Sequence, residues 1–385
     1  MAKEVTRYIK PEVERELWAR SAGRCQFDGC NRFVFRSPVT QEPVNISEKA
    51  HIYSFSQSGP RGWGPFVANK KQLNEISNLM LVCHDCHKTI DQDIQGDRYS
   101  ANLLIRWKEE HEKRIAIVTG VDPTKKSLVV LYGANIGEEK SLLQPAAAHD
   151  ALFPDWYPSE ERPIYLSMNW EGRDHDDAFW RTEITNLKSA FNRQLRPNLD
   201  NSDCLHLSLF ALAPIPLMIF LGSLLTDKVP AQTYQLHREP YQSWKWQNGP
   251  ADFAFQINRP KSTVHPPALV ISLSDNIAPS RIIAVLGEEV SIWELTIENP
   301  NNDFLKSKEQ LSQFRSTVRQ LIVDIGIVHG KHTPLAIFPA MPVACAVDIG
   351  RVRMPKADGP WIIYDNNNQQ KKFIYALEIG GTNHE

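Results

Sequence analysis

Four cysteines near the start of the chain stand in two closely spaced pairs. Cys25 and Cys30 have four residues between them, and Cys83 and Cys86 have two. Two such pairs together are typical of a tetrahedral zinc site with four thiolate ligands. Because such a site has no open coordination position, the spacing predicts a structural zinc ion, not a catalytic one. The alternative is two buried thiol pairs or a disulfide, which the Cys-x-x-Cys spacing disfavours.

Residues around the second cysteine pair could hold another metal ion. In the stretch NLMLVCHDCHKTID, His87 and Asp91 are four residues apart, so on a helix they share one face and can bind one divalent ion. Asn78 begins the same stretch, and His51 lies upstream in a predicted strand, KAHIY. The three polar residues therefore follow one another along the chain in the order His51, Asn78, His87.

This order, combined with both cysteine pairs, resembles the HNH (ββα-metal) nuclease family, in the subgroup that braces the motif with four cysteines. The resemblance covers about residues 20–95. It implies that His51 is the general base that activates water to attack a phosphodiester, a role that suits the near-neutral pKa of histidine. It also implies that His87 and Asp91 hold a catalytic Mg²⁺ or a similar divalent ion. Asn78 would orient the loop of His51 or approach the metal.

One position departs from the family pattern. Many members place Asp or His directly before the catalytic histidine as a further metal ligand, whereas this sequence has Ala50. The ion would then have fewer protein ligands and more waters, or His51 would itself be a ligand; we expect the base role. Candidate phosphate contacts are Arg61, in the segment GPRGWGP, and the lysines Lys70, Lys71 and Lys88.

The elements that must position these residues can be predicted from the sequence. Proline at the start and glycine at the end predict a helix over residues 11–22, a second helix begins near Cys86, and a capped amphipathic helix covers residues 100–118. The segment GVDPTKKS is typical of a linker. Beyond it, apolar strand-like runs alternate with helical stretches, which predicts βαβ units and a largely parallel sheet. We therefore expect a nuclease domain over residues 1–122 and an α/β domain over residues 123–385.

The second region contains an internal repeat. LSLFALAPIPLMIFLG at residues 207–222 aligns without gaps on LAIFPAMPVACAVDIG at residues 335–350. The aligned identities are Leu207/Leu335, Phe210/Phe338, Pro214/Pro342 and Gly222/Gly350. The repeat predicts two similar halves, over residues 123–258 and 259–385. The first block lies in an uncharged run of membrane-span length, but the aligned block carries Asp348, so we interpret the run as buried core and expect no membrane contact.

This duplicated region resembles the SAVED domain, a ligand sensor built from two CARF-like Rossmann halves. The resemblance rests on the two strand–proline–helix blocks and on the segment LSMNWEG at residues 166–172. It covers nearly all of residues 125–385 and implies binding of a cyclic di- or trinucleotide. HNH joined to SAVED resembles the effectors of CBASS anti-phage systems, in which such a second messenger triggers indiscriminate degradation of double-stranded DNA.

Candidate ligand contacts follow from the expected position of a ligand in this fold. In open α/β sheets, ligands bind beyond the carboxyl ends of the strands, where free N–H groups at helix starts can bind phosphates. An aromatic side chain there could stack on a base, amides and hydroxyls could hydrogen-bond a base, and cations could bind phosphates. The residues that we select on these grounds are Trp170, Ser274, Asn276, Phe338, Lys331 and Arg351.

Composition sets limits on the interpretation. The chain has 385 residues, a formal net charge of −2 and 23% charged residues, ordinary values for a globular protein of two or three domains. These values exclude a disordered chain and a uniformly basic nucleic-acid coat. The charged N-terminal segment contains no apolar signal-peptide core, and the closely paired cysteines favour metal binding over disulfides, so we expect a cytoplasmic protein.

The expected fold is an α+β ββα-metal (HNH) domain with a four-cysteine zinc site, followed by an α/β SAVED domain of two Rossmann-like halves. We interpret the chain as a cyclic-oligonucleotide-activated, metal-dependent endonuclease that cleaves double-stranded DNA without sequence preference. Because one HNH site cuts one strand, we expect a homo-oligomer that becomes larger on activation.

Two alternatives belong to other functional classes. The first is a restriction-type HNH endonuclease whose C-terminal domain reads modified DNA. Residues 123–385 carry a net charge of −4, whereas a DNA reader should have a basic face. The second is a non-enzymatic zinc module, which would leave the spacing of His51, Asn78, His87 and Asp91 unexplained.

Overall fold

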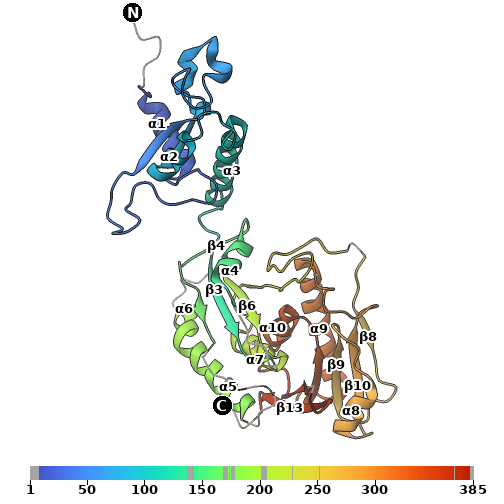
Figure 1. Cartoon of the computed structure of the whole chain (residues 1–385). Coiled ribbons are helices and arrows are strands. Elements are labelled where there is room, and N and C mark those ends of the chain that lie inside the picture. Colours follow the sequence, from blue (N-terminus) through green and yellow to red (C-terminus); the bar gives the residue numbers. More distant parts are fainter. Residues whose placement is uncertain are drawn as a thin grey trace, which may run out of the picture. The chain divides into compact units, whose positions relative to one another are not determined.

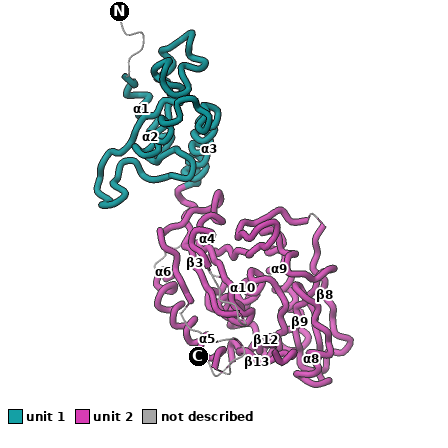
Figure 2. Tube along the Cα trace, viewed as in Figure 1, with its two compact units in different colours: residues 1–122 teal, residues 123–385 magenta. Residues whose placement is uncertain are grey.

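The chain forms two compact units, residues 1–122 and residues 123–385 (Figure 2). Each unit has its own hydrophobic core. A bilayer-spanning helix, which needs both length and an apolar surface, is absent from the part of the chain that the structure describes. The computed structural model describes residues 8–136, 143–167, 172, 174, 178–200, 206–227, 229–250, 252–367 and 369–381.

Unit 1 combines a small antiparallel sheet with helices. Its elements are α1 (Pro11–Ser21), β1 (Ser47–His51), β2 (Leu79–Cys83), α2 (His84–Asp91) and α3 (Ala101–Thr119). Short 3₁₀ turns between the strands cover Gly64–Val67, Lys70–Asn74 and Ile76–Asn78. The two strands pair with His51 opposite Leu79, and α2 follows β2 without a loop. The three predicted helices are confirmed, and strand, strand and helix follow in ββα order.

Local sequence signals explain these elements. Pro11 opens α1, and Ser100 caps α3 by accepting a hydrogen bond from the amide of Leu103. All five residues of β2 are buried, so this strand forms the centre of the core of unit 1. Because α2 begins directly after β2, the core fixes the start of the helix that carries His87 and Asp91.

The first half of unit 2 contains a five-stranded sheet in which the described pairings are all parallel. The strand order is β4-β3-β6-β7, and β5 also pairs with β3. In chain order the elements are β3 (Lys126–Gly133), α4 (Pro145–Leu152), β4 (Tyr157–Pro158), β5 (Ile164–Tyr165), α5 (Phe179–Ala190), a π turn (Phe191–Leu195), α6 (Arg196–Asp200), β6 (Leu207–Leu212), α7 (Ile215–Leu225) and β7 (Ala231–Thr233).

The second half contains a six-stranded sheet in the order β13-β12-β11-β9-β10-β8. The four inner strands are parallel, and the two edge strands are antiparallel to their neighbours, so the predicted, largely parallel sheet is confirmed. In chain order the elements are β8 (Gln256–Asn258), β9 (Pro267–Ser272), α8 (Pro279–Leu286), β10 (Ser291–Thr296), α9 (Lys308–His329), β11 (Leu335–Ala340), α10 (Val343–Val352), β12 (Trp361–Asn367) and β13 (Lys372–Ile379).

The two halves share one structural plan. Strands β6 and β11 begin at the first aligned leucine of the repeat, and a proline N-cap opens the helix that follows each of them. In each half an aromatic ring of the repeat stacks on a tyrosine. The ring centroids of Phe210 and Tyr234 are 4.3 Å apart, and those of Phe338 and Tyr364 are 4.5 Å apart. The predicted repeat is therefore a structural duplication.

Helices α7 and α10 lie between the two sheets and pack against each other at the aligned glycine of the repeat (Figure 1). A Cβ atom on Gly222 would lie 2.0 Å from the carbonyl oxygen of Val347, and one on Gly350 would lie 2.0 Å from that of Ile219. The two helix backbones therefore touch, which only glycine permits. The described part of the uncharged run, residues 206–225, forms β6 and α7 and is largely buried, as predicted.

This contact predicts a large effect of a single methyl group. Gly222→Ala should lower the free energy of unfolding of unit 2 by roughly 2–3 kcal/mol, because the backbones of α7 and α10 must separate. Urea unfolding of the full chain measures the change. Gly326→Ala on α9 is the matched control, since the nearest atom to its added Cβ is 3.7 Å away, and it should be neutral or slightly stabilising. Equal unfolding midpoints for the two variants would contradict the backbone contact.

Candidate active site and metal centre

The four paired cysteines meet in one cluster. Their sulfur atoms all lie within 4.8 Å of one another, and none of the four forms a disulfide. Cys25 and Cys30 come from the turn after α1, Cys83 ends β2, and Cys86 lies in the first turn of α2. Among the described residues, this is the one group of three or more His, Cys, Asp or Glu side chains close enough to hold a metal ion.

The chemistry of this cluster fits a soft divalent cation. Burial is the main cause that raises the pKa of the Cys25 thiol to about 12, and it also raises the pKa of Cys86. A cation among the four sulfur atoms would stabilise their thiolate forms. The backbone amide of Cys83 donates to Cys25 Sγ at 3.3 Å, a contact that favours a sulfur carrying negative charge. Four such donors at tetrahedral spacing are typical of zinc.

A second group of polar side chains lines a pocket of about 390 Å³ in unit 1. His51, the last residue of β1, faces this pocket together with His87 and Asp91 from α2. Nε2 of His87 lies 3.5 Å from Oδ2 of Asp91, so the two side chains share one face of the helix, as their spacing predicts. The ββα order thus brings the predicted base and both predicted ligands of the catalytic ion to one pocket.

A residue that the sequence did not indicate contacts the histidine. Nε2 of His51 lies 2.9 Å from the side-chain oxygen of Asn74. An amide oxygen only accepts hydrogen bonds, so in this contact Nε2 carries the proton and Nδ1 is the basic nitrogen of the neutral ring. Asn74 ends the 3₁₀ turn Lys70–Asn74 and donates to the carbonyl of Tyr8 at 3.2 Å. Nothing in its local sequence distinguishes it from an ordinary turn asparagine.

Asn78 lies in the core beside this turn. Its side-chain oxygen accepts from the amide of Tyr53 at 2.8 Å, and its side-chain nitrogen donates to the carbonyls of Tyr53 and Leu73 at 3.0 and 2.9 Å. With a side chain only 1% exposed, Asn78 connects the segment that follows His51 to the turn that carries Asn74. This is the geometry of a residue that orients a loop.

The position before His51 supplies no ligand. Ala50 is 3% exposed and packs in the core of unit 1. Glu48, two residues earlier, also lines the pocket, but its carboxylate lies 3.2 Å from Nδ1 of His84. Among the residues predicted from the sequence, His87 and Asp91 are therefore the two that can offer ligand atoms to a divalent ion beside His51.

Two of the predicted ligand contacts in unit 2 lie at the carboxyl end of a strand. Ser274 and Asn276 follow β9, and the amide of Ser274 donates to the carbonyl of Ala340, at the end of β11, at 2.8 Å. Ser274 is half-buried and Asn276 is exposed. Both are placed where a ligand of an open α/β sheet binds. Trp170 lies outside the described residues.

Two other predicted contacts are buried. Phe338 has no exposed surface, because its ring packs between Tyr364 and Phe373 in the core. Arg351 is 8% exposed, and its guanidinium donates to backbone carbonyls near the start of β7 and to Asp348 Oδ1 at 3.3 Å. Neither side chain is available to a ligand, so the prediction for these two residues is corrected: one is core and the other joins the two halves.

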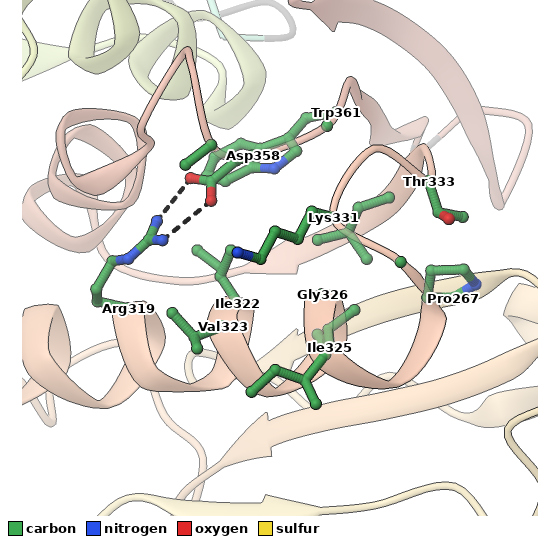
Figure 3. Close-up of a pocket in the computed structure, with 15 residues that line it drawn as sticks. Pro267, Arg319, Ile322, Val323, Ile325, Gly326, Lys331, Thr333, Asp358 and Trp361 are labelled. Carbon is green, nitrogen blue, oxygen red and sulfur yellow. Dashed lines mark hydrogen bonds and ion pairs between the residues drawn. The ribbon is translucent and has the colours of Figure 1, made fainter.

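Lys331 lies near the amino ends of the parallel strands, opposite to the ends where Ser274 and Asn276 lie. It precedes β11 and points into a cavity of about 130 Å³ at the amino ends of β9, β11 and β12 (Figure 3). Trp361 and the paired side chains of Arg319 and Asp358, with N–O distances of 2.6 and 3.0 Å, line the same cavity. The amino and carboxyl ends of parallel strands lie on opposite sides of a sheet, so Lys331 does not lie at the carboxyl ends, where Ser274 and Asn276 are.

Family comparisons match two separate regions of the chain. Residues 25–93 match the family described as HNH endonuclease. Residues 187–379, half of the chain, match the family described as "SMODS-associated and fused to various effectors sensor domain", or SAVED. The chain belongs to the SAVED family. It joins an N-terminal HNH endonuclease domain to a C-terminal SAVED domain, which confirms both resemblances.

Solved structures similar to this SAVED protein are Cap4 receptors. A Cap4 SAVED/CARF-domain containing receptor of Acinetobacter baumannii, with the cyclic trinucleotide 2'3'3'-cAAA, is 13% identical with a TM-score of 0.42; the match covers 72% of this chain and 55% of that one. The Cap4 receptor of Moraxella osloensis is 11% identical with a TM-score of 0.39, over 80% and 68% of the two chains. The chain thus spans about half the length of the first of these. No curated protein gave a match.

Proposed function

We propose that this protein is an endonuclease that cleaves double-stranded DNA when its SAVED unit binds a cyclic di- or trinucleotide, as an effector of CBASS-type anti-phage defence. The observation that carries the proposal is the presence of an HNH endonuclease domain and a SAVED sensor domain in one chain. The pocket that holds His51, His87 and Asp91 supports the nuclease activity.

In the proposed reaction, His51 is the general base. With the proton of its Nε2 directed at Asn74, Nδ1 accepts a proton from a water that attacks the phosphorus. The bond from phosphorus to the leaving oxygen breaks, and the leaving oxygen takes up a proton from solvent water. A Mg²⁺ or similar ion held by His87 and Asp91 would neutralise negative charge on the phosphate and the leaving oxygen. Asn78 keeps the segment after His51 in place.

We assign the four-cysteine cluster to a structural Zn²⁺. The four sulfur ligands leave no open coordination position, so this ion would hold β2 and α2 in register with the turn after α1 and would take no part in hydrolysis. In unit 2, the loop of Ser274 and Asn276 is the surface that we propose for the ligand. Its place at the carboxyl end of β9 supports this assignment.

Activation is expected to depend on assembly. One HNH site cuts one strand, so a double-strand break favours two nuclease units that act together, and a ligand can drive such assembly only by binding the assembled form more tightly. We expect little plasmid cleavage with Mg²⁺ alone, and strong cleavage together with a larger particle mass when the activating member of a cyclic di- and trinucleotide panel is added. Nuclease assays and light scattering on the same samples measure both.

The His51→Ala protein is the control for this experiment, because it should assemble with the nucleotide without cutting. Full activation at unchanged mass would contradict the assembly step and indicate release of an inhibited nuclease within a fixed oligomer. Nucleotide-independent cleavage that prefers modified DNA would contradict the sensor function and support the restriction-type alternative.

A further inference from the structure

Arg61 has a strained backbone beside the nuclease pocket. It lies in the segment GPRGWGP with φ of +63°, in the left-handed region that side chains other than glycine rarely adopt. Its amide donates to the carbonyl of Ile94 at 3.2 Å. Such strain costs free energy and persists where the surrounding structure imposes it, often at functional sites. This backbone conformation places the side chain of Arg61 within hydrogen-bond distance of several backbone carbonyls.

The guanidinium of Arg61 donates to four backbone carbonyls from three segments. Nε donates to Ile52 at 2.5 Å and Nη2 to His51 at 3.5 Å, both at the end of β1. Nη1 lies 3.4 Å from the carbonyl of Ile90, in the last turn of α2, and 3.5 Å from that of Tyr99. One side chain therefore joins the backbone of the proposed base to the end of the helix that carries Asp91.

The side chain of Arg61 packs closely against the backbone of Gly96. A Cβ atom on Gly96 would lie 2.9 Å from Cγ of Arg61. Glycine at this position, with φ of +78°, therefore avoids a steric clash with the arginine side chain. Burial lowers the pKa of Arg61, while the charges of Asp91 and Asp93 oppose this shift. The side chain lines the same pocket as His51, His87 and Asp91.

We propose that Arg61 is a positioning residue of the nuclease site, which fixes the main chain of His51 relative to the end of α2 that carries Asp91. The inference rests on the proposed nuclease function. It replaces the phosphate contact predicted from the sequence, because the guanidinium donors point to backbone carbonyls. The planar guanidinium suits this role because its donors diverge, whereas a lysine ammonium is a single point of charge that cannot reach all three segments.

The test compares Arg61→Ala and Arg61→Lys in the full, nucleotide-activated chain. We expect kcat for plasmid cleavage to fall by about a hundredfold in both variants, because a small displacement of the base has an effect of this size. KM for DNA should stay within about twofold of the parent value, since no DNA contact is lost. Free guanidinium, at concentrations far below those that unfold proteins, should restore part of the activity of Arg61→Ala and none of that of His51→Ala.

Arg15→Ala is the matched control, because it removes the same charge from an exposed position on α1, where Arg15 pairs with Glu12. It should cleave like the parent. Bound zinc and the urea midpoint show whether each variant is folded, and Arg61→Lys decides the outcome if Arg61→Ala is unfolded. A raised KM with full activity of Arg61→Lys would overturn the inference in favour of a phosphate contact. A parent protein that cuts no DNA under any condition would instead contradict the proposed function.

Discussion

His51→Ala is expected to reduce DNA cleavage by a factor of about 10²–10⁴, the range that a positioned general base contributes. The imidazole stands at the end of β1 and faces the pocket that it shares with His87 and Asp91. In the proposed reaction, its contact with Asn74 leaves Nδ1 to accept the proton from the attacking water. Alanine removes the proton acceptor and leaves the four cysteines unchanged, so zinc content and stability should stay at parent values.

The measurement is nicking of supercoiled plasmid by the activated chain, with metal analysis and urea unfolding on the same preparation. Asn74→Ala is a useful second variant, because it keeps the imidazole but removes the amide oxygen that Nε2 of His51 contacts, together with the hydrogen bond to Tyr8. Its activity should fall between those of the parent and His51→Ala. Near-normal nicking by a folded His51→Ala protein would show that another group is the base.

Much of the fold and part of the site could be predicted because the signals are local. The spacing of Cys83 and Cys86 and the four-residue step from His87 to Asp91 describe neighbours within one turn of helix, where sequence distance fixes spatial distance. The repeat predicted the paired halves, and its aligned glycines are the point at which α7 and α10 touch.

The features of the site that the sequence does not reveal depend on contacts between segments far apart in the chain. Asn74 reaches His51 across 23 residues, and Arg61 reaches Tyr99 across 38, so no local pattern reveals either pairing. Its place near the end of β11 predicts that Phe338 contacts a ligand, yet its ring is fully buried and stacks on Tyr364. A strand that is buried on both faces is a continuous run of apolar residues, so its sequence does not show whether a given ring packs in the core or reaches a ligand.

Cys83→Ser is expected to have the largest effect on stability. At a four-thiolate zinc site, the binding energy is folding energy, with apparent values of about 10–16 kcal/mol in small zinc domains. Cys83 is 1% exposed, its amide donates to Sγ of the buried Cys25, and it is the N-cap residue of α2. Losing this ligand should therefore release the zinc, unfold unit 1 and abolish cleavage, because His87 and Asp91 depend on the same helix.

Cys345→Ser is the matched control, since this cysteine is also fully buried but lies in the core of unit 2, away from the cluster. It should keep its zinc and its nuclease activity, with a modest loss of stability confined to unit 2. Metal analysis of the intact chain and hydrogen exchange resolved by segment distinguish the two variants. For Cys83→Ser, fast exchange should extend over residues 1–122 and stop at the boundary with unit 2, because each unit has its own core. Less than one zinc ion per parent chain, or a Cys83→Ser protein whose first unit stays protected, would contradict the four-thiolate assignment.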